Sequence, residues 1–213
     1  MAAPIFKKNT LEQTQFSLTD NGFTYLGEMY HFDEVAEVRS YRVIHQTRHV
    51  PFGGTTEHDP AIAILIAMKD GKQIQITEQS TWTSSSKQNN IDKIQHAFKC
   101  ICSKTKDQRM RKYITEIEKY GAFEYGGWKF LPNEQILIEI KTGNSYKRSE
   151  MRFKKGYGFI AMEPVNEGLT AKLIRKAKQE FSGHQIRINT LSDTDVFFDL
   201  LRHYFRLSWS KNP

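Results

Sequence analysis

The sequence predicts an α+β protein built from two strand-rich units, each followed by an amphipathic helix at its C-terminal end. Two observations predict this fold class. Short runs of alternating apolar and polar residues, separated by turn-forming residues, recur along both halves of the chain, as antiparallel strands require. Apolar residues at helical spacing then end each half, at residues 91–101 and 196–205. A chain of 213 residues is long enough for one or two domains with real hydrophobic cores.

The first unit contains two predicted hairpins. Alternating residues on both sides of Asn-Gly at 21–22 predict two strands joined by a tight turn. Strand patterning resumes over residues 30–43, and a loop rich in Gly and Pro follows at 51–60. Residues 61–76 then form the clearest hairpin of the chain, because Asp-Gly at 70–71 separates two apolar runs.

Two helical patterns follow this hairpin. Ile91, Ile94, Phe98 and Ile101 fall on one helical face, and Asn89 or Asn90 is expected to cap that helix. After a polar run, a second pattern covers residues 110–117 and stops at Gly121. The predicted organisation is therefore a first domain at 1–104, a connecting helix at 105–122 and a second domain at 123–213.

The second unit repeats the first in outline. Trp128 and Phe130 match Tyr30 and Phe32, and residues 136–140 match the strand region that begins at residue 35. Further strands are expected at residues 153–162 and 185–189, with an additional helix inserted at 169–181. Ser192 and Asp195 resemble a capping box that starts the final helix at 196–205.

The first unit resembles a bacterial pleckstrin-homology-like (PH-like) domain. The resemblance is carried by Leu-Thr-Asp-Asn-Gly-Phe-Thr-Tyr at 18–25, Tyr-His-Phe-Asp-Glu-Val at 30–35, Lys-Asp-Gly-Lys-Gln-Ile-Gln-Ile at 69–76 and the helix that follows. It covers residues 15–102 and, more weakly, 123–209. It implies two antiparallel, strongly bent sheets, each a split barrel closed by its C-terminal helix.

The same resemblance implies a scaffold or protein-binding role. Phosphoinositide-binding members use basic residues in the first hairpin, and this chain has none around residues 20–22. The leading hypothesis is a non-enzymatic interaction module that contacts a protein partner through strand edges or through the groove beside each closing helix.

The charge distribution indicates a possible anionic partner. The formal net charge is +7, and residues 141–188, with 11 basic and 4 acidic side chains, account for the whole excess. Nucleic acid is one alternative partner. Acidic lipid is another, and the inserted helix would contact it. The positive charge is also explained by a solvent-exposed surface with no partner. The candidate anion-binding residues are Lys147, Arg148, Arg152, Lys154, Lys155, Lys172, Arg175 and Lys176.

Enzyme signatures are weak. Glu139 and Lys141 resemble half of the metal-binding signature of restriction-endonuclease-like nucleases, but Pro-Asn at 132–133 stands where that family has Pro-Asp. The alternative explanation is that Glu139 and Lys141 lie on the solvent-exposed face of an amphipathic strand. Cys100 and Cys102 are expected to be free thiols. The sequence thus predicts no catalytic site, no metal and no cofactor.

The expected location is the cytoplasm, and we expect a bacterial protein. The longest apolar run, residues 61–68, is much shorter than the roughly 18 residues that span a bilayer. The N-terminal residues lack the apolar core of a signal peptide. The oligomeric state stays open.

Overall fold

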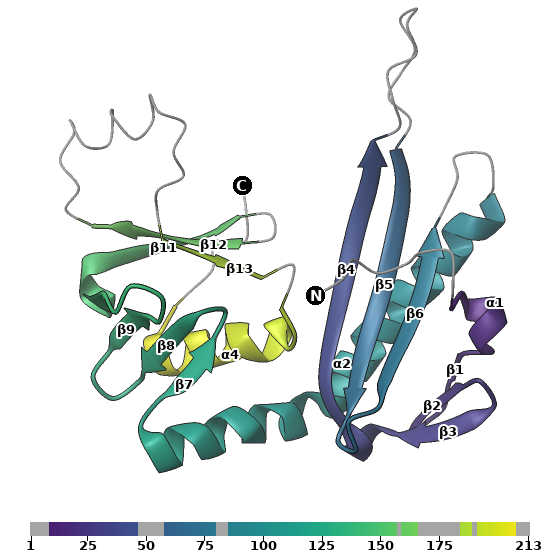
Figure 1. The fold of residues 1–213 in the computed structure, drawn as a ribbon, viewed down its shortest axis with the longest axis horizontal. Coiled ribbons are helices and arrows are strands. Elements are labelled where there is room, and N and C mark those ends of the chain that lie inside the picture. The colour runs from purple at the N-terminus through teal and green to yellow at the C-terminus, as the bar shows by residue number, and fades with distance from the viewer. Residues whose placement is uncertain are drawn as a thin grey trace, which may run out of the picture. The chain divides into compact units, whose positions relative to one another are not determined.

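The structure is a computed structural model that describes residues 9–46, 58–79, 85–156, 159–165, 184–188 and 191–207 (Figure 1). The chain divides into two compact units, Met1–Arg109 (unit 1) and Met110–Pro213 (unit 2). Both contain helices and antiparallel strands, so the protein is α+β as the sequence predicted. Each unit has a hydrophobic core of its own.

Unit 1 contains two three-stranded antiparallel sheets, ordered β1-β2-β3 and β4-β5-β6. A single 3-10 turn, η1, joins them, and a long helix follows the second sheet. The elements are α1 (Leu11–Thr14), β1 (Ser17–Leu18), β2 (Gly22–Tyr25), β3 (Glu28–His31), η1 (Phe32–Glu34), β4 (Val35–Gln46), β5 (His58–Met68), β6 (Gln73–Gln79) and α2 (Ser85–Tyr120).

Unit 2 contains a four-stranded sheet, ordered β10-β9-β8-β7, and a three-stranded sheet, ordered β11-β12-β13. Its own 3-10 turn, η2, again joins the two sheets, and a helix again follows. The elements are β7 (Phe123–Tyr125), β8 (Trp128–Leu131), β9 (Ile136–Glu139), β10 (Ser145–Lys147), η2 (Arg148–Glu150), β11 (Met151–Gly156), β12 (Phe159–Pro164), β13 (His184–Arg187) and α4 (Thr194–Phe205).

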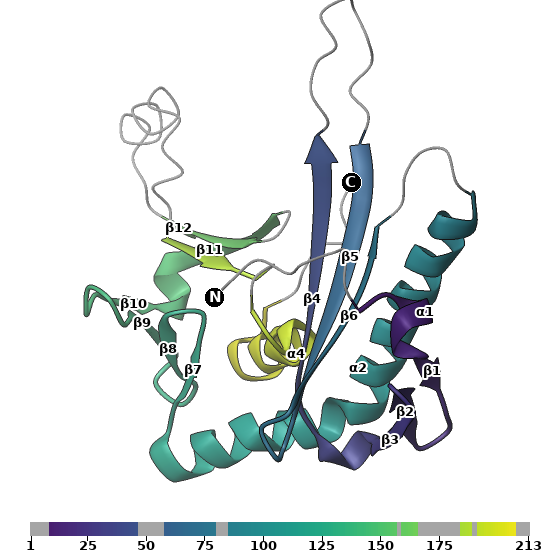
Figure 2. The ribbon, with the colours of Figure 1, turned by 45° about the vertical axis from the view of Figure 1, so that its right-hand side comes forward.

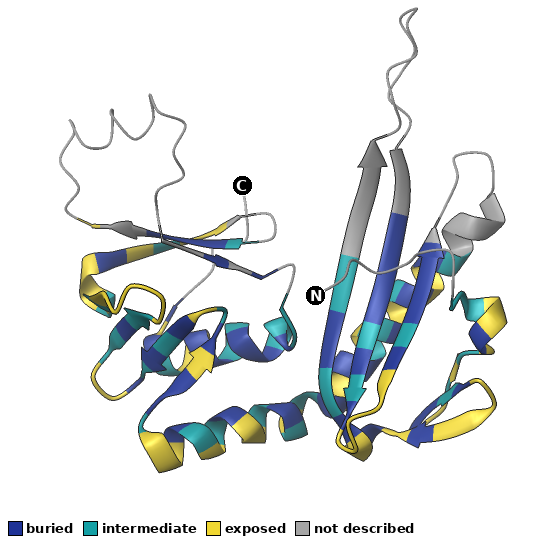
Figure 3. Ribbon diagram, in the orientation of Figure 1, coloured by how far each residue is buried: buried dark blue, intermediate teal, exposed yellow. Residues whose placement is uncertain are grey.

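The core of unit 1 lies between its strands and α2. Helix α2 runs along one face of the β4–β6 sheet in both ribbon views (Figures 1 and 2). Ile94 and Ile101 of α2 are fully buried and belong to the same apolar cluster as Ile64 and Ile76 of the sheet. Buried stretches are coloured along β4, β5, β6 and α2 in Figure 3. Burying one such side chain contributes roughly 1.5–3 kcal/mol, which makes the predicted apolar face the main attachment of the helix.

The core of unit 2 is rich in aromatic side chains. Phe130 of β8 stacks on Phe123 of β7, with ring centroids 4.9 Å apart, and meets Phe197 and Phe205 of α4 edge-on. All four side chains are almost fully buried. Tyr113, on the last turns of α2, completes this cluster. The predicted apolar face of the final helix therefore packs into the core that the strands of unit 2 form.

Helix α2 is continuous where the sequence predicted two helices separated by a polar run, and that prediction is wrong. Within the run, Thr105 Oγ1 donates to the carbonyl oxygen of Ile101 (2.7 Å), and Arg109 Nε donates to Thr105 Oγ1 (2.9 Å). The helix also begins at Ser85, upstream of the predicted asparagine cap. Residues 103–109 contain neither Gly nor Pro, so helical hydrogen bonding continues without an apolar stripe. The predicted stop is confirmed, because Gly121 has φ +68°.

Two further expectations need correction. Ser192 does not form a capping box: α4 begins at Thr194, and its N-cap, Asp193, is left-handed and makes no side-chain cap. The described strands also form two sheets in each unit, where one sheet per unit was expected, and none of these sheets is a closed barrel. The reason lies at η1 and η2, where three residues of 3-10 helix interrupt the strand ladders between successive sheets.

Both units have the same backbone hydrogen bonds around the 3-10 turn. In each unit, the first N–H of the turn donates to the carbonyl oxygen of the residue before the last but one strand of the first sheet. The N–H of the residue after the second strand of the next sheet donates to the carbonyl oxygen of the last residue of the turn. The bonds are Phe32 N to Asn21 O (2.9 Å) and Lys69 N to Glu34 O (2.8 Å) in unit 1, and Arg148 N to Gln135 O (2.8 Å) and Val165 N to Glu150 O (2.8 Å) in unit 2.

These bonds give a residue-level match between the two units. Tyr30 pairs with Phe23, and Tyr146 pairs with Leu137, so Tyr146 occupies the position of Tyr30. The sequence had matched Phe130 with Phe32, but the residue at that position is Arg148. Strand β7 has no described counterpart in unit 1.

No helix within the described ranges is both long enough and apolar enough to cross a membrane.

Candidate anion-binding site

A pocket of about 270 Å³ in unit 2 is lined by three arginines. Arg148 comes from η2, Arg152 from β11, and Arg206 from the residue that ends α4. Segments more than 50 residues apart in the sequence thus bring three cations to one cavity. The other lining residues are Ser149, Met151, Phe153, Val165 and Leu207.

Arg148 is held by the backbone around it. Its Nη1 donates to the carbonyl oxygen of Met151 (3.0 Å), and its Nε donates to that of Phe205 (3.3 Å). The guanidinium carbon lies 5.0 Å from the ring centroid of Phe153. Partial burial lowers the pKa of Arg148, but a guanidinium stays charged in proteins. A fixed positive charge therefore stands at the wall of the pocket.

Arg152 and Arg206 are exposed, so their guanidinium groups are available to a ligand in solution. Arg206 has φ +50°, and its N–H donates to the carbonyl oxygen of Leu201, which ends α4. No carboxylate is found among the described residues that line it.

The corresponding corner of unit 1 is built without an arginine. Phe32 occupies the position of Arg148 and is buried. The carbonyl groups of Phe32 and Val35 accept hydrogen bonds from Gln108 Nε2, at 2.5 and 2.8 Å. Because a phenylalanine and a glutamine satisfy this corner in unit 1, the fold itself does not require the cation that unit 2 places there.

The structure brings together only part of the predicted basic set. Arg148 and Arg152 share the pocket, whereas Lys155 lies over the ring of Phe198 at 4.6 Å, and Lys147 and Lys154 are exposed on β10 and β11. Lys172, Arg175 and Lys176 lie outside the described residues. Arg206 was missed because the charges of residues 189–213 balance, so no local excess marks it.

Glu139 and Lys141, the pair that resembles half of a nuclease signature, do not lie on one strand. Strand β9 ends at Glu139, and Lys141 is exposed in the turn that follows, so the two do not share a strand face. Glu139 accepts a hydrogen bond from Thr142 Oγ1 (2.7 Å). In the part of the chain that the structure describes, no group of three His, Cys, Asp or Glu side chains is placed to hold a metal.

The chemistry of the arginine pocket is anion recognition. A guanidinium offers a planar fork of donors that matches the two oxygens of a carboxylate or a phosphate. Three such groups around a small cavity suit one compact anionic group. Comparisons of the chain with protein-family models, with curated proteins and with solved structures found no match.

Proposed function

We propose that this protein is a non-enzymatic interaction module with two PH-like units, and that unit 2 binds an anionic side chain of a protein partner. The observation that carries the proposal is the convergence of Arg148, Arg152 and Arg206 on one pocket. A phosphorylated or acidic residue supplies the oxygens that such a pocket accepts.

The order of elements supports the PH-like assignment. In each unit an antiparallel sheet, a 3-10 turn, a three-stranded sheet and a helix follow one another. We take the two sheets of a unit as the two halves of a bent split barrel, with the helix as its closing element. Shared cores, to which α2 contributes Ile94 and α4 contributes Phe197, are consistent with that role.

A single anionic group fits the described cations better than a nucleic-acid strand does. Nucleic acid requires a series of cations along its backbone. On β11, alternation sends Arg152 and Lys154 to one face and Lys155 to the other, beside Phe198. Arg148, Arg152 and Arg206 thus gather at one pocket, whereas Lys155 faces the other side of β11.

The proposal can be tested by NMR titration of the full chain with O-phosphoserine and with inorganic phosphate. We expect the arginine Nε resonances of the pocket to shift with both ligands. The double variant Arg152→Gln with Arg206→Gln should weaken binding at least tenfold, since each arginine–phosphate hydrogen bond is worth roughly 1.5–3 kcal/mol. Arg148 is left intact because it also bonds the backbone.

The matched control is Lys104→Gln with Lys141→Gln, which removes the same charge from exposed positions that do not line the pocket. If both double variants bind phosphoserine equally weakly, the loss comes from net charge and not from the pocket, which would overturn the proposal. Gel shifts with single-stranded DNA and sedimentation with acidic vesicles, each at two salt concentrations, test the other partners. If the protein binds DNA or acidic vesicles tightly and in a salt-dependent way, and does not respond to phosphoserine, the partner is nucleic acid or membrane and not a protein.

A further inference from the structure

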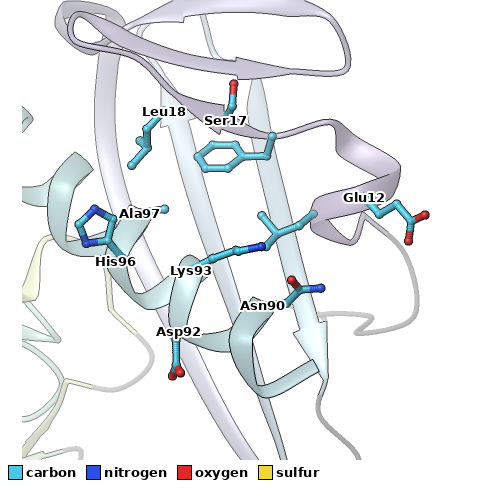
Figure 4. Close-up of a pocket in the computed structure, with 10 residues that line it drawn as sticks. Glu12, Ser17, Leu18, Asn90, Asp92, Lys93, His96 and Ala97 are labelled. Carbon is cyan, nitrogen blue, oxygen red and sulfur yellow. The ribbon is translucent and has the colours of Figure 1, made fainter. Parts of the chain in front are cut away.

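Unit 1 has a groove of about 640 Å³ between β1 and the N-terminal half of α2 (Figure 4). Phe16 and Leu18 line it from the strand side, and Ala97 lines it from the helix. Lys93 and His96 of α2 and Glu12 of α1 also line it, together with Asp92. The groove thus combines apolar side chains on both walls with acidic and basic groups.

The corresponding place in unit 2 is filled by strand β7. Leu18 pairs with Phe23 in unit 1, as Phe130 pairs with Leu137 in unit 2, so Leu18 and Phe130 are equivalent. On its other side Phe130 pairs with Phe123 of β7. Strand β1, by contrast, lies at the edge of its sheet, and no described strand pairs with that edge.

Strand β7 shows what such a groove accepts. Phe123 and Tyr125 are buried, whereas Glu124 between them is exposed. The ring of Tyr125 stacks on Phe197 of α4, with centroids 3.8 Å apart. The strand therefore fills the space between β8 and α4 with two aromatic side chains and turns the intervening polar residue to solvent.

The backbone of β1 is suited to the same pairing. Thr19 N donates to Gly22 O (3.0 Å), which makes residues 19 and 17 the ones that bond β2. By alternation, the N–H and C=O groups of Leu18 point to the open edge. Phe16 N donates to Leu11 O (3.3 Å), so α1 closes one end of that edge and leaves it open from Leu18 onward.

We propose that the unit 1 groove binds an extended segment of a partner protein, which adds to β1 as β7 adds to β8. The segment pairs its backbone with Leu18 and places an aromatic or large apolar side chain between Leu18 and Ala97. Its residues alternate apolar and polar, as Phe-Glu-Tyr does in β7. This site is independent of the arginine pocket, because its lining residues all belong to unit 1.

The probe is a fluorescein-labelled peptide with the sequence of residues 119–127, Lys-Tyr-Gly-Ala-Phe-Glu-Tyr-Gly-Gly. Its binding to the full chain is followed by fluorescence anisotropy. Two N-methylated forms of the peptide are compared. In the first, the methyl group blocks the N–H of the residue that matches Phe123, and this N–H faces the neighbouring strand. In the second, it blocks the N–H of the residue that matches Glu124, and this N–H faces away from that strand. We expect the first to bind about tenfold more weakly or worse, and the second to bind like the unmodified peptide.

The site at which the peptide binds is identified from changes in the amide chemical shifts of the protein. Binding in the groove should shift Leu18 and Ala97, and Ala97→Phe, which fills the groove, should abolish those shifts. The N-methylated peptides need no change in the protein, so the test survives if that variant fails to fold.

Equal weakening by both N-methyl groups, no binding at millimolar concentration, or shifts confined to Tyr125 and Phe197 of unit 2 would each overturn the proposal. Binding seen only after removal of residues 1–8 would identify the chain's own N-terminal segment as the occupant and overturn the assignment to a partner.

Discussion

Replacing Arg148 by methionine tests whether this arginine supports the fold as well as the pocket. Methionine keeps an apolar side chain beside Phe153 but removes the donors to the carbonyl groups of Met151 and Phe205, which lie 3.0 and 3.3 Å away. Hydrogen bonds from charged groups contribute about 1.5–3 kcal/mol each when well formed. Because the 3.3 Å bond is long and the side chain is partly exposed, we expect a total loss of about 2 kcal/mol in the free energy of unfolding of unit 2.

The assay is urea unfolding followed by the fluorescence of Trp128, a buried residue of unit 2. Trp82 and Trp209 are replaced by phenylalanine in every protein compared, so that Trp128 is the single reporter. The control is Arg152→Met, the same chemical change at an exposed position of the pocket, which should stay within about 0.5 kcal/mol. Equal losses in the two variants, or no loss with Arg148→Met, would refute the backbone-holding role of Arg148.

Three further outcomes are expected. Gly22→Ala should destabilise unit 1 by about 3 kcal/mol, the upper end for overpacking, because an added Cβ would overlap the carbonyl oxygen of Tyr30; thermal unfolding checks this. Tyr125→Phe should cost unit 2 about 1 kcal/mol in urea, since the hydroxyl donates to the carbonyl oxygen of Ser192 at 2.8 Å. Glu28 has a pKa below its ordinary 4.5, chiefly through a lysine hydrogen bond, so its small contribution to stability is present above that pH and is lost on acidification. Glu28→Gln should remove this part of the pH dependence, which falls below about pH 5, in urea titrations.

Segments with strong turn chemistry or a buried stripe were predictable from the sequence. Asp70 and Gly71 form the predicted tight turn, with Gly71 at φ +91° and Asp70 Oδ1 accepting from the N–H of Lys72. Polar helical turns were not predictable. Residues 85–90 and 103–109 extend α2 without an apolar period, so spacing could not reveal them. Strand β10 was missed for a similar reason, because its sequence Ser-Tyr-Lys offers one apolar position.

The candidate site was predictable in part. The local excess of positive charge pointed to Arg148 and Arg152, which do share a pocket. Arg206 joins them through the fold, since α4 ends beside η2, and no local pattern could show that. For unit 1, strand edges and the groove beside the closing helix were expected as contact surfaces, but no sequence pattern showed which strand edge is open. The strand pairing makes Leu18 equivalent to Phe130, and no described strand beside β1 is equivalent to β7, so the open edge is a property of the fold.

The unbroken course of α2 bears on the order in which the chain folds as it is synthesised. Ile91–Ile101 complete the core of unit 1, and Tyr113 and Ile117 on the same helix belong to the core of unit 2. During translation the helix is made before any strand of unit 2, and N-terminal domains generally fold first. Helix nucleation is the costly step, whereas extending an existing helix is cheap. Once unit 1 has folded on the ribosome, the part of α2 that carries Tyr113 and Ile117 would therefore already be helical. The strands of unit 2 can then pack against it as they are made.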